Sequence, residues 1–141
     1  MGALGLKATI TVEHPRQVGA ENNHSLAEIA VDAPSSLGYT FLEAGWIVQG
    51  DHPASLFANH WLRGNSSCNF VAYHQRCGFV PSGGGLLPGA MLVPGTKLTV
   101  EWRQLRRKWW LFVDDKPSGY YPDSLWHGRS PAPRRVDLWR G

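Results

Sequence analysis

Short stretches in which apolar and polar residues alternate recur along the chain and predict β-strands. In LKATITV, residues 6–12, every second residue from Leu6 is apolar and every second residue from Lys7 is polar. The same period of two occurs in SLFANHWL at 55–62, and in KLTVEW and WWLFV, which flank the polar stretch RQLRRK at 103–108. This last arrangement predicts a hairpin with a charged tip.

Two further segments add candidate strands. Residues 25–31, SLAEIAV, fit either a strand or a short helix, and we favour a strand because the turn-rich DAPSSLG follows. GFV at 78–80 follows a loop that contains both cysteines, and no segment shows a sustained helical period. We therefore predict a single all-β domain over residues 1–141, an antiparallel β-sandwich of about seven or eight strands with little helix.

The composition agrees with this prediction. The chain has 141 residues, a length that suits one domain with one hydrophobic core. It contains seven Trp, four Tyr and five Phe together with 16 Gly and 10 Pro, a balance that favours strands joined by many turns.

One predicted strand carries an acidic residue in an apolar setting. In FLEAGWIV, residues 41–48, both faces of the alternating pattern are mostly apolar, which is typical of a central strand covered on both sides. Burying the carboxylate of Glu43 costs free energy unless its charge is paired or used. Glu43 is therefore either a structural glutamate that hydrogen-bonds a neighbour or a functional carboxylate in a covered or concave face. Gly45, two residues on, leaves a slot in which a ligand backbone could approach.

The formal net charge of +3 is weak evidence about partners. Basic residues gather in the C-terminal part of the chain, above all in RQLRRKWW at 103–110. This group fits either a nucleic-acid patch with stacking aromatics or a charged hairpin tip, and we favour the tip. No apolar run approaches the roughly 18 residues that span a bilayer. We therefore expect neither a nucleic acid nor a membrane as a partner.

The chain has two cysteines, Cys68 and Cys77, in CNFVAYHQRC. No further Cys is present to complete a thiolate zinc site. The spacing allows a local disulfide, which we favour, or two free thiols. A disulfide would stabilise the fold by roughly 2–3 kcal/mol and would indicate an oxidising compartment. The N-terminal MGALGLKATITV does not predict a signal peptide, because no basic segment precedes a long apolar one.

Motifs for most other chemistries are missing. The six His never fall at a metal-ligand spacing, no Gly-x-Ser-x-Gly elbow occurs, and PSGGGLLPG lacks the Lys-Ser or Lys-Thr of a phosphate-binding loop. We therefore expect no metal and no cofactor. Several acidic residues lie in turns or beside polar neighbours, as expected of solvated charges: Glu13, Glu21, Asp32, Asp51, Asp114, Asp115 and Asp123. Glu43 differs from these carboxylates because it lies within an apolar strand pattern.

Several blocks of sequence carry a resemblance to a known family. They are LKATITVEHP, NNHSLAEIAV, LEAGWIV, LFANHW, CNFVAYHQRCGFV, KWWLFV and SGYYPDSLW, and they follow one another over most of residues 5–139. In order and rough spacing these blocks resemble those of the neprosin-type glutamic peptidases. Glu-Ala-Gly-Trp at 43–46 is a specific sign in this context.

The resemblance implies a secreted endopeptidase with an antiparallel β-sandwich fold, made with a pro-segment, that cuts peptides or proteins after proline and works best in acid. In that family the glutamate of the Glu-Ala-Gly-Trp block is one of two catalytic glutamates, which corresponds to Glu43 here. Cys68 and Cys77 correspond to the paired cysteines of the family, with a longer loop than in plant members. One carboxylate would activate water, while a second, protonated one would support the oxyanion or the leaving nitrogen.

The second catalytic glutamate has no clear counterpart in this sequence. In the family it follows a Trp-Gly-Gly segment after the Gly-Tyr-x-Pro turn, whereas this chain has VDLWRG and ends at Gly141. We therefore expect a domain without the terminal strands of the family, in which Asp137 is the nearby carboxylate that could substitute. Two alternatives stay open, a catalytically inactive fragment and a β-sandwich module that binds carbohydrate or peptide through exposed tryptophans and Glu43.

Aromatic residues are candidates for the lining of a substrate site, among them Trp46, Trp61 and Tyr121. Trp46 faces opposite Glu43 in the alternation, so we predict that it is a core residue.

Overall fold

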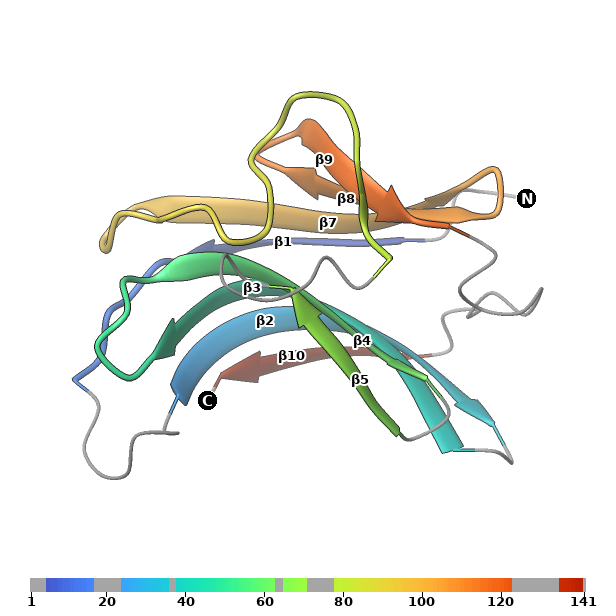
Figure 1. Ribbon diagram of the computed structural model, residues 1–141, viewed down its shortest axis with the longest axis horizontal. Helices are drawn as coiled ribbons and strands as arrows, with labels where there is room; N and C mark the ends of the chain where they lie inside the picture. Colours follow the sequence, from blue (N-terminus) through green and yellow to red (C-terminus); the bar gives the residue numbers. More distant parts are fainter. Residues whose placement is uncertain are drawn as a thin grey trace.

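The computed structural model describes residues 5–16, 24–35, 38–62, 65–70, 78–122 and 135–140. Within these ranges, side chains are described outside 32–40, 62–70 and 135–140. The described chain forms two antiparallel sheets that lie face to face as two layers (Figure 1).

Each sheet has five strands, and neighbouring strands often come from distant parts of the sequence. The first sheet has the spatial order β1 (Gly5–Thr11), β7 (Lys97–Leu105), β8 (Lys108–Val113), β9 (Lys116–Tyr121) and β6 (Val80–Pro81). The second has the order β10 (Arg135–Arg140), β2 (His24–Ser35), β3 (Gly38–Gln49), β4 (Ser55–Leu62) and β5 (Asn65–Phe70).

This architecture confirms the predicted all-β antiparallel sandwich. The described residues contain ten strands, compared with an expectation of about seven or eight, and β6 is only two residues long. No helix in the described part of the chain is long and apolar enough to cross a membrane.

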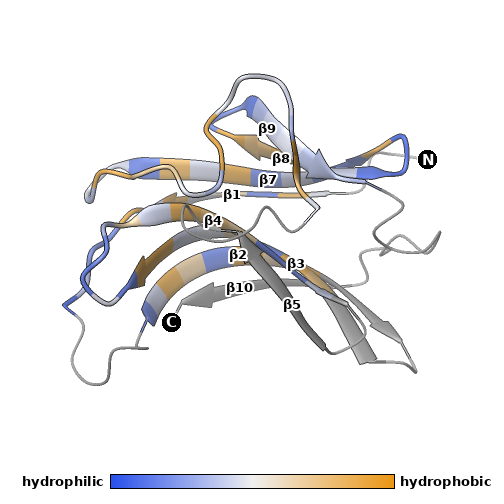
Figure 2. Cartoon of the chain, in the orientation of Figure 1, coloured by the Kyte–Doolittle hydropathy of each residue, from blue (hydrophilic) through white to orange (hydrophobic). Residues whose placement is uncertain are grey.

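The alternating pattern explains how each strand contributes to the core. Along β7, Leu98, Val100 and Trp102 are buried, whereas the residues between them are half-buried. Figure 2 shows this alternation as successive apolar and polar bands along the strands of the first sheet. Because side chains on one face of a strand recur at every second position, both sheets present an apolar face to each other.

The core lies between these two faces. Its largest fully buried side chains include Trp102, Trp109 and Tyr121 from the first sheet and Leu42 and Leu56 from the second. The Tyr121 ring stacks on Trp102, with ring centroids 5.7 Å apart, and meets the edge of the His60 ring of β4 at 5.0 Å. Aromatic packing therefore joins the two sheets at their centre.

Tight turns connect β7 to β8 and β8 to β9. Arg106 and Arg107 have φ angles of 49° and 63°, and Asp114 and Asp115 have φ angles of 49° and 64°. Two successive residues with positive φ form the hairpin turn whose twist matches that of the flanking strands. The predicted hairpin is confirmed, but its turn is only Arg106 and Arg107, because the rest of the polar stretch 103–108 belongs to the paired ends of β7 and β8.

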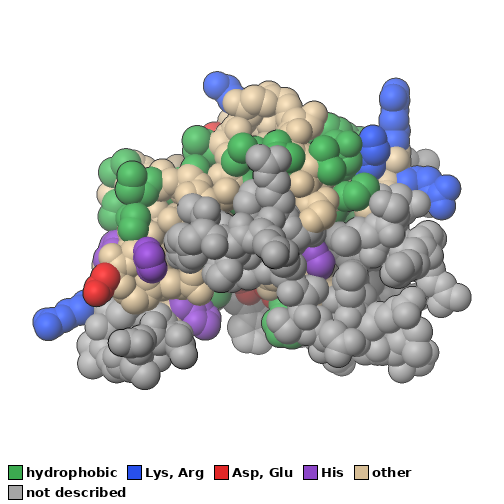
Figure 3. Space-filling view, in the orientation of Figure 1, with side chains coloured by type: hydrophobic (Ala, Val, Ile, Leu, Met, Phe, Trp, Pro, Cys, Tyr) green, Lys and Arg blue, Asp and Glu red, His purple; other side chains and the backbone are tan. Residues whose placement is uncertain are grey.

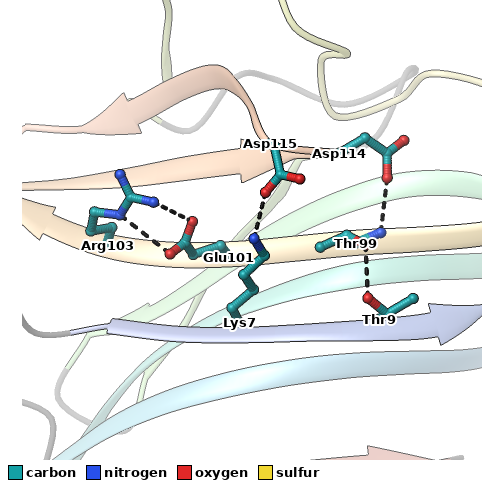
Figure 4. A network of polar contacts seen from close by, with 7 residues as sticks. All are labelled: Lys7, Thr9, Thr99, Glu101, Arg103, Asp114 and Asp115. Carbon is teal, nitrogen blue, oxygen red and sulfur yellow. Dashed lines mark hydrogen bonds and ion pairs between the residues drawn. The ribbon is translucent and has the colours of Figure 1, made fainter.

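The outer face of the first sheet carries a network of polar contacts that joins β1, β7 and the turn after β8 (Figure 4). The pairs are Lys7 with Asp115, Thr9 with Thr99, Asp114 with the Thr99 backbone N–H, and Arg103 with Glu101. The two ion pairs, Lys7–Asp115 and Arg103–Glu101, are partly or largely exposed, so each contributes little to the free energy of unfolding.

Apolar side chains also reach the surface around the first sheet and the loop before β7 (Figure 3). In that loop Met91 is 72% exposed and Val93 is 67% exposed. Cys77 lies outside the described residues, as does the side chain of Cys68, so the predicted disulfide stays a prediction.

Candidate functional site

The site is built on the face of the second sheet that turns away from the core. In Figure 1 the strands of this sheet arch, and the concave side of the arch is the side away from the first sheet. Glu43 on β3 pairs in register with Ala30 on β2 and Asn59 on β4. Register partners share a face, so these side chains stand together on the concave face.

Glu43 is held in place by neighbours on β4. The Asn59 side-chain amide donates a hydrogen bond of 2.9 Å to Oε2 of Glu43. Burial raises the pKa of Glu43 above its ordinary value, while hydrogen bonds from Asn59 and then Trp61 act in the opposite direction because they favour the ionised form. Glu43 is thus a half-buried carboxyl that has hydrogen-bond donors for its charged state.

A second glutamate lies on the same face and was missed by the sequence reasoning. Glu28 on β2 is only 9% exposed, and its buried Oε2 has no hydrogen-bond partner within the described part of the chain. Burial, followed by the charge of Glu43, raises the pKa of Glu28 to about 8. A signal was present in SLAEIAV, because Glu28 lies between apolar residues in a predicted strand, as Glu43 does.

The register places the two glutamates on a diagonal. Glu28 pairs with Gly45, and Glu43 lies two residues before Gly45 on the same strand. Diagonal positions on one face of an antiparallel pair have α-carbons about 7–8 Å apart, within reach of long side chains. The electrostatic influence of Glu43 on Glu28 agrees with this arrangement.

A small apolar cluster lies on the same face as Glu28. Ile47 and Phe57 are 3% and 2% exposed, and Leu26 packs against them. Phe57 is the register partner of Gly45, and Leu26 lies two residues before Glu28, so the cluster stands on the concave face next to Glu28. Apolar surroundings disfavour the charged form of a carboxyl.

The expectation that Gly45 leaves a slot for a ligand backbone is wrong. A Cβ at this position would lie 1.9 Å from the carbonyl oxygen of Ala27 and 2.8 Å from the α-carbon of Glu28. The backbone of β2 therefore occupies the space that glycine leaves. Gly45 allows β2 and β3 to approach each other closely, and it adds no side chain to the face that carries Glu28.

Asp137, the other predicted catalytic residue, lies on β10. Its register partner is Ala30, which in turn pairs with Glu43, so two strand spacings separate the backbones of Asp137 and Glu43. This corresponds to about 9–10 Å. The side chain of Asp137 lies outside the described part, and its role stays a prediction.

The three aromatic candidates for a substrate site lie in different places. Trp46 is 3% exposed and donates from its indole N–H to the Thr11 backbone oxygen, which confirms its prediction as a core residue. Tyr121 is fully buried between the sheets. Trp61 is half-buried and pairs in register with Phe41, beside Glu43 on the concave face.

No three His, Cys, Asp or Glu side chains in the described ranges stand close enough together to hold a metal ion. Among the described side chains the concave face presents two carboxyls, one with hydrogen-bond donors for its ionised form and one in apolar surroundings.

The model of the Neprosin family matches residues 21–139. The chain belongs to the Neprosin family. The Neprosin match includes Glu28, Glu43 and Asp137, and it confirms the family resemblance of the sequence blocks. No match to a curated protein was found.

Proposed function

We propose that this Neprosin-family domain is a secreted glutamic endopeptidase that hydrolyses peptide bonds after proline. The observation that carries the proposal is Glu43 itself, a half-buried carboxyl on the concave face whose ionised form accepts a hydrogen bond from Asn59. Membership of the family supports a peptidase-like activity in general.

Glu43 is suited to activate water. Its hydrogen bond from Asn59 fixes the carboxylate, and burial raises its pKa, which makes it a stronger base than a solvated glutamate. In the proposed reaction Glu43 removes a proton from water as the water oxygen bonds to the peptide carbonyl carbon. A second, protonated carboxyl then has to stabilise the oxyanion and protonate the leaving nitrogen. Asp137 is the sequence-based candidate for that second group.

Aromatic residues next to Glu43 support the proposed preference for proline. Trp61 and Phe41 are register partners next to Glu43, and the hydrogen bond to Glu43 orients the Trp61 indole. A flat aromatic surface beside the attacking water suits a pyrrolidine ring, which stacks on aromatic side chains without a large entropy cost.

The first prediction tests this activity with quenched-fluorescent peptides that differ only in Pro or Ala before one bond. We expect cleavage after Pro at acidic pH, with the cut located by mass spectrometry. Glu43→Gln should lower kcat/KM about a thousandfold or more, because the general base is lost while the shape of the site is kept.

Glu101→Gln is the matched control, since it removes a carboxylate from the outer face of the other sheet. It should cleave at the rate of the unmodified chain. Full activity in Glu43→Gln, or cleavage with no preference for Pro, would contradict the proposal. An inactive chain with a native circular dichroism spectrum would favour the alternative of a domain without catalytic activity.

The alternative of a carbohydrate-binding module has less support from the aromatic residues. Trp46, Trp102 and Trp109 are core residues that no sugar ring can reach. Trp110 packs against Tyr120, with ring centroids 4.8 Å apart. Titration with glycans, followed by tryptophan fluorescence, separates the two functions because a peptidase gives no saturable response.

A further inference from the structure

We propose that Glu28 is the proton-carrying partner of Glu43, so that the two glutamates form the acid and base pair of the site. This inference rests on the proposed peptidase function and names a catalytic residue beyond Glu43 and Asp137. It is carried by the position of Glu28 on the concave face, diagonal to Glu43, and by its unpartnered buried oxygen.

The geometry favours Glu28 over Asp137. Glu28 and Glu43 lie on adjacent strands, with α-carbons about 7–8 Å apart on the diagonal. Asp137 is separated from Glu43 by the whole of β2, about 9–10 Å between backbones, and its side chain is shorter by one methylene. Gly45 has no side chain to stand between Glu28 and Glu43.

The two carboxyls differ in what surrounds them, and this assigns their roles. Glu43 accepts a hydrogen bond from Asn59, which favours its charged form. Glu28 lies beside the apolar cluster of Leu26, Ile47 and Phe57, and its buried Oε2 has no donor among the described residues. A carboxyl in such surroundings is more stable with its proton, as a pKa of about 8 also indicates.

The order of titration follows from the same difference. The charge of Glu43 raises the pKa of Glu28, whereas burial is the only cause that raises the pKa of Glu43. Glu28 is still neutral when Glu43 loses its proton, so Glu28 exerts no charge on Glu43 at that stage.

Other ionisable groups lie on the elements packed around the pair. On β4 the neighbours of Glu43 are the neutral Asn59 and Trp61. Tyr121 and His60 lie on the core side of the second sheet. On β10, Asp137 pairs with Ala30 and shares its face, whereas Arg140 pairs with Ala27, which faces the core. On β2, Asp32 pairs with Phe41, so its backbone stands on the other diagonal of Glu43, and its side chain lies outside the described part.

The reaction balances with these two carboxyls. Glu43 takes one proton from water while the water oxygen bonds to the carbonyl carbon, and the carbonyl electron pair moves onto its oxygen, which accepts a hydrogen bond from the Glu28 O–H. When the C–N bond breaks, its electron pair and the Glu28 proton go to the leaving nitrogen, and the carbonyl re-forms. The proton on Glu43 then passes to Glu28, which restores the starting state.

The test combines a titration with a pH–rate profile. Carbon-13 NMR of the glutamate side chains gives the pKa of Glu28 in the unmodified chain and in Glu43→Gln. We expect a raised value in the first and a lower value in the second, still above 4.5 because the burial remains. A pKa near 4.5 in the unmodified chain, or one that Glu43→Gln leaves unchanged, overturns the inference.

The kinetic arm compares three variants whose folding is checked by circular dichroism. Glu28→Gln should lower kcat about a hundredfold and remove the alkaline limb of the pH–rate profile, because no proton is left to lose. Asp137→Asn and Glu101→Gln should keep that limb. Loss of the limb in Asp137→Asn, with Glu28→Gln unaffected, assigns the proton to Asp137 and overturns the inference.

The two proposals fail in different ways. A chain that cleaves no peptide, but in which Glu43→Gln lowers the pKa of Glu28, contradicts the peptidase function and supports the carboxyl pair. A chain that cleaves after proline with Glu28→Gln at full rate supports the peptidase function and contradicts the pair.

Discussion

Two glutamates on one face show how a residue acquires properties that its side chain alone does not have. Glu28 and Glu43 have the same chemical group, yet one has an apolar cluster beside it and the other an amide donor. The surroundings raise the pKa of both, and they differ in the way that the proposed acid and base roles require.

The raised pKa of Glu28 also predicts how stability depends on pH. Between pH 4.5 and about 8 the folded chain keeps the Glu28 proton, whereas the unfolded chain has lost it. The contribution of Glu28 to the free energy of unfolding is therefore greatest at the acidic end of this window and falls by up to about 1.4 kcal/mol per pH unit towards its alkaline end. Thermal unfolding followed by circular dichroism from pH 4 to 9 measures this slope.

Glu28→Gln should flatten that slope, because the variant has no proton to keep. It should also be more stable than the unmodified chain at the alkaline end, where the unmodified chain carries a buried charge that costs free energy. Glu101→Gln serves as the control and should keep the original slope. Parallel curves for the unmodified chain and Glu28→Gln would show that Glu28 titrates normally.

At the scale of elements, the close pairing of β2 with β3 positions the site. Gly45 permits this pairing because the β2 backbone fills the place of a Cβ. Any side chain at this position would move β2 and with it Glu28.

We expect Gly45→Ala to lower the free energy of unfolding by about 2–3 kcal/mol or more, since the clash is with backbone atoms that have no other rotamer. Gly84→Ala is a useful control, because Gly84 has a φ of 77° and no atoms lie within 4 Å of the methyl group that alanine would add. It should cost only the strain of its backbone conformation, about 1–2 kcal/mol. Denaturant unfolding of both variants measures the difference, and equal costs would contradict the packing explanation.

At the scale of the whole molecule, the two sheets depend on one shared core. Tyr121 at the end of β9 contacts Trp102 of the first sheet and His60 of the second. This core packs against the face of the second sheet opposite the concave face.

Tyr121→Ala should therefore lower the free energy of unfolding by about 3–5 kcal/mol, because it leaves a large cavity between the sheets. Denaturant unfolding followed by tryptophan fluorescence measures the loss. The exposed Met91→Ala is the control and should change the midpoint little, since Met91 is 72% exposed. A small effect of Tyr121→Ala would show that the sheets hold together without this contact.

The sequence pattern did not predict some of the strands, for identifiable reasons. β9 contains Pro117 and Gly119, which weaken a strand pattern, and its partners are β8 and β6. β5 contains Cys68 and lies where the sequence predicted a loop. β10 follows a Pro-rich stretch. These strands form because neighbouring strands offer hydrogen bonds, which a local pattern does not reveal.

The sequence by itself determined the all-β class, the faces of the main strands, the hairpin around 103–108 and the unusual position of Glu43, because a period of two residues is a local property of the chain. Only the tertiary structure decided that Glu28 stands diagonal to Glu43, and that the β2 backbone fills the space at Gly45. These facts depend on strand pairing and register between separate segments, where a shift of one residue would move every side chain to the opposite face.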